Sequence, residues 1–424
     1  MGYLVVSLFI FFVLYSKRFG NVLSKTLILL CFFSLHFDLL EVPFIGISFE
    51  ELFTVLFIML VFIKYRFMRV PERKLIIGLS LLLAIVVGFF FLIIDPPSTK
   101  VVGPTDSWDL VIYGLRSMRN ASFSSENSKR LLRMILYIIM ILIFANLEKS
   151  DEVKNNIVKY VVNFGFVISL IGLLEYVLTY LFGFNVLRGI FSLVFRGNYT
   201  ERLLIRGNLF SISVLNGEPN GFANGILPGL MFVANGFYKT KKHIEIILIL
   251  AYCSAGVFSS SLAGFALSLF GLFIFITNRF ISKRSRQKVL MFSLALFLVI
   301  IAISSDYYFS RIAGVAGVRD AVGSEGIRTY SIKSAFQWFL ERPLFGMGLG
   351  TVNCYGAIPA LLASTGIIGS ILWFLLTFSF DIKNWRKSVL FIIVLLFLSF
   401  LGSIGTTYSI LPILLSMNFW SERS

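Results

Sequence analysis

Charged residues are scarce in this chain of 424 residues: they make up 14% of it, whereas 57% of its residues are hydrophobic. Soluble domains are about 25% charged and roughly 45–50% apolar. Apolar stretches of about 20 residues recur along the whole length, each long enough to cross roughly 30 Å of hydrocarbon. Because they lack the alternation of a membrane barrel, the composition argues against a soluble protein and predicts an all-α polytopic membrane protein.

Cysteine and histidine are also rare, with three Cys and two His in the chain. Cys31, Cys253 and Cys354 lack metal-binding spacing, and neither His36 nor His243 has a convincing ligand partner, so we expect no metal site. The sequence contains no Walker A loop, no HExxH zinc motif and no GxSxG nucleophile elbow. These absences argue against direct ATP use, zinc-protease chemistry and the serine-hydrolase class, and no cofactor is expected.

The apolar stretches predict about 12 transmembrane helices in a single membrane domain over 1–424. The last stretch is too long for one helix and is interrupted by Gly402, Gly405 and Pro412, so it predicts two spans, or one span and a re-entrant piece. The N-terminal stretch lacks the features of a signal peptide and is predicted to be a retained helix. The predicted spans are 2–16, 22–40, 47–63, 75–94, 130–147, 157–182, 210–237, 244–258, 261–278, 289–304, 356–380 and 388–418.

Basic residues are concentrated in every second predicted loop. Short loops rich in Lys and Arg are typical of the cytoplasmic side of a membrane protein. This pattern places the N-terminus on the outer face, together with the long loops 95–129, 183–209 and 305–355. The net charge of +16 is spread over the short loops, so it indicates membrane topology and no nucleic-acid partner.

Arginine is nevertheless frequent in two outer loops, where the positive-inside rule predicts few basic residues. A guanidinium group binds phosphate oxygens through paired hydrogen bonds and stays charged when it is partly desolvated. The set therefore predicts a phosphate or pyrophosphate site at the outer surface. For any one arginine, contact with lipid headgroups or pairing with Asp or Glu is an equally good interpretation. The basic residues are Arg188, Arg196, Arg202, Arg206, Arg311, Arg319, Arg328, Lys333 and Arg342.

Within the late outer loop, segment 324–343 is predicted to form a surface helix that Pro343 ends. Apolar residues at spacings of i, i+3, i+4 and i+7 predict one apolar face, and Trp338 suits a membrane interface. Arg328 is predicted in the first turn, where a cation is unfavourable unless an anion is also bound there. The residues of the predicted apolar face are Ile332, Ala335, Phe336 and Phe339.

Polar residues also lie where the chain enters its seventh predicted span. Glu218, Asn220 and Asn224 fall at or just inside the membrane boundary, where ionisable groups are costly and are functional candidates. Glu218 is a candidate general base or substrate-orienting residue; the alternative is an acidic first-turn residue favoured by the helix dipole. Glu175, inside the span 157–182, is a candidate buried partner for an arginine.

Two segments resemble the O-antigen polymerase and O-antigen ligase superfamily. The late loop has Arg328 and Trp338, then PLFGMGLG at 343–350 and GIIG at 366–369, similar to the pattern of that superfamily. Upstream, Arg206 is followed after ten residues by a glycine, which resembles an element of polymerase outer loops. The run GEPNGFA that begins at this glycine resembles the family's loop-to-helix transition.

This resemblance implies a helical bundle like that of the glycosyltransferase C superfamily, with a large late outer loop. It implies polymerisation of O-antigen or capsular repeat units carried on undecaprenyl pyrophosphate, at the periplasmic side of a bacterial cytoplasmic membrane. Arg206 and Arg328 then neutralise the pyrophosphate, Glu218 activates the acceptor, and no metal is needed. The implied partners are the lipid-linked oligosaccharide, membrane lipids and a regulator of chain length. The implied substrate-binding residues are Arg196, Arg202, Arg311, Arg319, Asn220 and Tyr355.

One position separates the polymerases from the ligases. The ligases of the superfamily have a histidine followed by Asn, Ser or Gln, then nine residues and then GxxG. In this chain, which resembles them in the GxxG at 366–369, Tyr355 stands in place of the histidine and Gly356 in place of the next residue. A phenol with a pKa near 10 is a weak base, so the base stays open. Because polymerases tolerate the missing histidine, the resemblance favours a polymerase over a ligase. A flippase or transporter is the third hypothesis, disfavoured because no internal repeat is evident.

Overall fold

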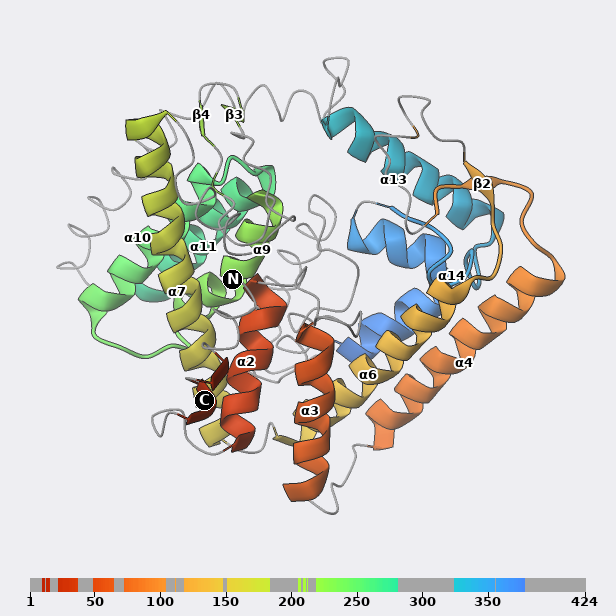
Figure 1. Ribbon diagram of the computed structural model, residues 1–424, viewed down its shortest axis with the longest axis horizontal. Coiled ribbons are helices and arrows are strands. Elements are labelled where there is room, and N and C mark those ends of the chain that lie inside the picture. Colours follow the sequence, from red (N-terminus) through yellow and green to blue (C-terminus); the bar gives the residue numbers. More distant parts are fainter. Residues whose placement is uncertain are drawn as a thin grey trace. The chain divides into compact units, whose positions relative to one another are not determined.

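The structure is a computed structural model, and it is mostly helical. Its described residues form ten helices and two two-stranded hairpins (Figure 1). They fall into two compact units: unit 1 contains 1–61 and 150–312, and unit 2 contains 62–149 and 313–424. The described residues are 10–11, 13–15, 22–36, 49–64, 72–103, 111, 118–147, 151–183, 205–206, 209–210, 212, 219–280, 324–354 and 356–377.

Unit 1 is a bundle in which α9 and α10 pack against each other, and each also packs against α7 and α11. Tyr252 of α10 is fully buried, and its hydroxyl donates a hydrogen bond to the Val162 carbonyl of α7 at 2.6 Å. Gly165 and Gly229 leave room for this ring, because a Cβ at either position would collide with it. The elements of unit 1 are α2 (Val22–His36), α3 (Phe49–Lys64, which runs past the unit boundary), α7 (Asp151–Phe182), β3 (Ile205–Arg206), β4 (Leu209–Phe210), α9 (Pro219–Ala234), α10 (Lys242–Phe258) and α11 (Leu262–Phe280).

Unit 2 is built around α14, which packs against both α4 and α13. Figure 1 shows α14 as two helical segments that meet at a bend, and Gly366 at that bend has non-helical backbone angles. The core under α13 includes Val101, Trp338, Met347 and Ala363. The elements of unit 2 are α4 (Glu72–Ile94), β1 (Lys100–Val101), β2 (Arg119–Asn120), α6 (Ser125–Leu147), α13 (Ser324–Glu341) and α14 (Ala357–Thr377).

Three of the described helices are long and apolar enough to cross a membrane, which confirms a helical protein with membrane-spanning character. They are Glu72–Ile94, Val158–Phe182 and Ile358–Thr377, and they match the predicted spans 75–94, 157–182 and 356–380. The predicted spans 289–304 and 388–418 lie outside the described residues, and the number of about 12 spans stays a prediction.

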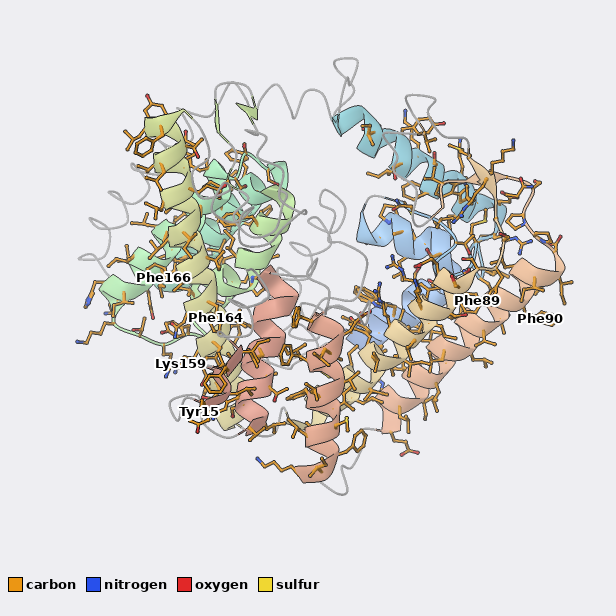
Figure 2. The ribbon with its side chains drawn as sticks, in the orientation of Figure 1. Tyr15, Phe89, Phe90, Lys159, Phe164 and Phe166 are labelled. Atoms are coloured by element: carbon orange, nitrogen blue, oxygen red, sulfur yellow. The ribbon has the colours of Figure 1, made fainter. Side chains whose placement is uncertain are left out.

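The exposed surface of these spans is apolar, as hydrocarbon requires. On α4, Phe90 is 59% exposed, whereas its neighbour Phe89 is 7% exposed; Figure 2 marks both on this helix. Large exposed apolar side chains recur at helical spacing along α4 and along α7, and a patch of this extent indicates contact with lipid or another apolar partner. The exposed residues are Leu79, Leu83, Val86, Phe90, Ile93, Val167, Leu170, Leu174, Val177 and Leu181.

Candidate functional site

Helix α13, which contains Arg328, buries only part of its predicted apolar face. Phe336 is 37% exposed, and neither Ile332 nor Phe339 is buried. The buried side is formed mainly by small residues, which let α13 pack closely on α14. The predicted apolar face is therefore only partly buried: Ala335 is buried, whereas the three larger side chains are not. The buried residues of α13 are Ile327, Ser331, Ser334, Ala335 and Trp338.

Trp338, which was predicted to suit a membrane interface, is instead buried inside the protein. It is 1% exposed, and its indole Nε1–H donates a hydrogen bond to the Lys100 carbonyl of β1 at 3.2 Å. A buried indole needs such a partner for its N–H group. Trp338 therefore fastens α13 to the β1–β2 hairpin inside unit 2.

The C-terminal end of α13 holds the segment that follows α4. Glu341 Oε1 accepts hydrogen bonds from Ser98 N at 3.0 Å, Ser98 Oγ at 3.3 Å and Thr99 N at 3.3 Å. Partial burial raises the pKa of Glu341, but the hydrogen bonds from Thr99 and Ser98 outweigh it and hold that pKa below its ordinary value. Arg342 Nη2 lies 3.0 Å from Asp95 Oδ2, so this outer-loop arginine pairs with a carboxylate of the protein, one of the two alternatives considered for any single arginine.

The two late glycine segments, 343–350 and 366–369, contact each other directly. Gly366 breaks α14 with a φ of +65°. The freed N–H groups of the next two residues are satisfied by the other segment: Ile367 N donates to Pro343 O at 2.8 Å, and Ile368 N to Leu344 O at 3.3 Å. A helix break at membrane depth is tolerated only when other parts of the protein satisfy its backbone groups.

The glycines allow this approach of backbone to backbone. Gly346 has a φ of +69°, and a Cβ built on it would lie 2.5 Å from the Ser364 carbonyl carbon. A Cβ on Gly366 would collide with Leu344 in the same way. Met347 N completes the contact by donating to Ala363 O at 2.7 Å. The motif glycines therefore build one rigid junction between the loop and the broken helix.

Asn127 holds the far end of this loop against α6. It is fully buried, and its Nδ2 donates to Leu349 O at 2.8 Å and to Thr351 Oγ1 at 2.9 Å. Its Oδ1 accepts from the backbone N–H of Ser124 at 2.7 Å, which is the reciprocal part of a capping box. Asn127 was not among the predicted site residues, although the pattern Ser-x-x-Asn before an apolar run was a signal for it.

The predicted site residues divide between the two units. Arg206 lies in β3, where it pairs with Leu209, and Asn220 lies in the first turn of α9, both in unit 1. Arg328 lies in α13 of unit 2 and is the fifth residue of that helix, one position beyond its first turn. The predicted residues that lie outside the described part of the chain are Arg196, Arg202, Glu218, Arg311, Arg319 and Tyr355.

Unit 1 has several buried polar groups, on α7 and in the turn between α10 and α11. Glu175 of α7 is 2% exposed, so its burial is confirmed, and its pairing with an arginine stays a prediction. The turn between α10 and α11 contains Ser259, Ser260 and Ser261, all fully buried, and Ser260 has a positive φ of 47°. Ser261 Oγ accepts from Gly264 N at 3.4 Å, so this hydroxyl serves as a helix N-cap.

Metal-binding side chains do not cluster in the part of the chain that the structure describes, since no group of three or more His, Cys, Asp or Glu occurs there.

Comparisons with models of known families, with curated proteins and with solved structures found no match. The likeness to O-antigen polymerases therefore stays a prediction carried by the residues of two segments, 206–225 and 328–369.

Proposed function

We propose that this chain polymerises lipid-linked O-antigen or capsular repeat units. In the reaction, a hydroxyl oxygen of the acceptor sugar forms a bond to the anomeric carbon of the donor glycan. The bond between that carbon and the pyrophosphate oxygen breaks, so undecaprenyl pyrophosphate leaves with the bonding electrons. The acceptor proton passes to a base, for which Glu218 is the candidate. Because cleavage of the bond between the glycan and the pyrophosphate drives the transfer, no nucleotide is consumed.

One observation carries this proposal: the two motif segments behind the resemblance, 343–350 and 366–369, interlock. If each segment resembled the family only by chance, there would be no reason for the two segments to contact each other. Their contact through Gly346 and Gly366 gives the pair a common structural purpose. This junction directly follows α13, which positions the backbone of Arg328.

The proposal includes a membrane arrangement. About 12 helices cross a bacterial cytoplasmic membrane in a bundle like that of the glycosyltransferase C superfamily, and the active site faces the periplasm. The alternation of basic loops supports this orientation, and the exposed apolar faces of α4 and α7 support the membrane location. The end of α4 at Asp95 then lies on the outer side, together with α13.

Arginines of the outer loops supply the electrostatic part of the mechanism. Negative charge grows on the pyrophosphate as the glycosidic bond breaks, and positioned guanidinium groups stabilise that charge. Arg206 and Arg328 are assigned this role, with Arg196, Arg202, Arg311 and Arg319 in substrate binding. Asn220 and Tyr355 are assigned to sugar hydroxyl groups, which their polar atoms can bind.

The test is the glycan phenotype of a strain that lacks this chain. Loss of a polymerase leaves lipid A core with a single repeat unit, and re-expression restores the ladder of long chains on a gel. Loss of a ligase leaves no repeat on the core and polymer on the carrier, whereas loss of a flippase traps single units on the inner face. Either of the last two patterns contradicts the proposal.

Point variants then test the assigned arginines in the same strain. Arg328→Ala and Arg206→Ala should each leave the single-repeat pattern, provided that protein levels match the wild type. Lys129→Ala is the matched control, because Lys129 is an exposed cation of the same predicted face, paired with Glu126 at 2.9 Å. Wild-type chain length in both arginine variants would remove them from the mechanism.

A further inference from the structure

The glycine loop contains three consecutive buried residues whose N–H groups have no acceptor among the residues that the structure describes. Gly348, Leu349 and Gly350 are buried, and within the described part of the chain none of their N–H groups donates a hydrogen bond. Their neighbours differ: Met347 N donates to Ala363 O, and Thr351 N donates to Gly348 O. Buried backbone N–H groups are rarely left without a partner, so a run of three needs an explanation.

The carbonyl groups of this run, in contrast, have partners. Gly348 O accepts from Thr351 N at 3.1 Å, and Leu349 O accepts from Asn127 Nδ2 at 2.8 Å. The carbonyl groups of Gly348 and Leu349 therefore hold the loop in place, while the N–H groups of the run have no acceptor among the described residues. A fixed loop that offers donors is suited to a ligand that offers only acceptors, such as an anion.

The side chain of an arginine lies beside the same run. A Cβ on Gly350 would lie 2.9 Å from Arg130 Cγ, so the half-buried Arg130 side chain passes directly over this glycine. Glu126 O, at the start of α6, lies equally close, which brings the positive end of the helix dipole to the loop. The nearby carboxylate of Glu126 is paired with Lys129.

We infer that the N–H groups of Gly348, Leu349 and Gly350, together with the guanidinium group of Arg130, bind a phosphate-type anion. This inference rests on the proposed function where it names the ligand: the diphosphate of the lipid carrier. Phosphate oxygens accept several hydrogen bonds at once, and both backbone N–H groups and arginine bind them well. None of these four residues was among the predicted site residues. A sequence shows neither which backbone N–H groups lack an acceptor nor which side chain lies against a glycine in the folded chain.

A single substitution can remove one N–H group and keep the loop. The turn Gly348–Thr351 closes with the Thr351 N to Gly348 O bond, and Gly350 has a φ of +83°. That value at the third residue is typical of a type II turn, in which proline is common at the second residue. Leu349→Pro therefore deletes the Leu349 N–H group in a compatible turn, and Leu349→Ala is the control that loses the side chain alone.

The measurement is binding of inorganic pyrophosphate to the purified full-length protein in detergent. Binding of phosphatidylglycerol in mixed detergent micelles is measured in a separate experiment. Leu349→Pro should weaken binding about tenfold or more relative to Leu349→Ala, since a hydrogen bond to a charged group is lost. A loss for pyrophosphate indicates the diphosphate, and a loss for phosphatidylglycerol alone indicates a lipid headgroup. Equal affinity in the Leu349 pair, or no binding of either probe by the wild type, overturns the inference.

A second pair decides the matter if Leu349→Pro does not unfold cooperatively. Arg130→Gln should weaken the same binding about tenfold or more, whereas Lys129→Gln removes an exposed neighbouring charge and should not. Unchanged binding in Arg130→Gln then overturns the inference. Failure of the proposed function has another signature: a strain without the chain still makes long glycans, whatever the purified protein binds.

Discussion

At the scale of single residues, the glycines of the late loop act through backbone geometry. Gly346 and Gly366 both have positive φ values, and each brings its own backbone against that of the other segment. A side chain at either position would meet a strained backbone conformation and a collision at the same time. The run PLFGMGLG is therefore a packing requirement first, whatever chemistry the neighbouring residues perform.

We expect Gly346→Ala to lower the free energy of unfolding by about 3 kcal/mol or more, the sum of backbone strain and overpacking. Gly183→Ala is the matched control: Gly183 has a φ of +70° but nothing within 4 Å of its would-be Cβ, so only strain of about 1–2 kcal/mol applies. Thermal unfolding of both variants in detergent measures the difference. Equal losses would mean that the contact with Ser364 contributes nothing.

At the scale of elements, α13 shows what sequence patterns predict and what they miss. Its helical state and its end before Pro343 follow from local signals, and both are confirmed. Its buried face does not follow, because apolar spacing assumes that the largest apolar residues are inside. In the folded chain, Ser331 and Ala335 face the neighbours because small residues allow close packing, and Trp338 is drawn inward by the Lys100 carbonyl.

The contact between the end of α13 and the segment after α4 should depend on pH through Glu341. Hydrogen bonds from Ser98 and Thr99 place the folded-state pKa of Glu341 below its unfolded value. The carboxylate therefore contributes stability above the unfolded pKa of about 4.3, and that contribution is lost as the pH falls through the folded pKa.

Glu341→Gln isolates this contribution, because glutamine keeps the shape of the side chain and does not titrate. The difference in melting temperature between wild type and variant should be full at pH 6 and should shrink as the pH is lowered below about 4.3. Thermal scans of both proteins across this range give the measurement. A difference that does not change with pH would show that the charge of Glu341 contributes nothing to this contact.

At the scale of the whole molecule, the sequence predicts apolar helices better than it predicts the candidate site. Spans such as 75–94 and 157–182 follow from composition alone, since hydrocarbon demands apolar residues and satisfied backbone groups. The site does not follow, because the loop contacts of Asn127, and N–H groups that lack acceptors among the described residues, depend on chain segments far apart in sequence. The pairing of Arg342 with Asp95 could not be predicted either, because no local sequence pattern connects these two residues.

The membrane orientation provides the last prediction. The distribution of basic loops predicts that the β1–β2 hairpin lies on the outer side and the turn before α10 on the cytoplasmic side. Asn120 in β2 and Lys239 before α10 are both exposed, so a cysteine at either position is accessible to a reagent on its own side. A membrane-impermeant maleimide should label Asn120→Cys in intact spheroplasts and Lys239→Cys only after permeabilisation.

Two native cysteines, Cys253 and Cys354, give little background in this assay. Cys253 is buried, and burial raises the pKa of Cys354 to about 12, so very little reactive thiolate forms near neutrality. Wild-type protein, labelled in parallel, sets the baseline. Labelling of Lys239→Cys in intact spheroplasts would contradict the predicted orientation. The opposite orientation would place α13 and its glycine loop on the cytoplasmic side, which is incompatible with a polymerase that acts in the periplasm.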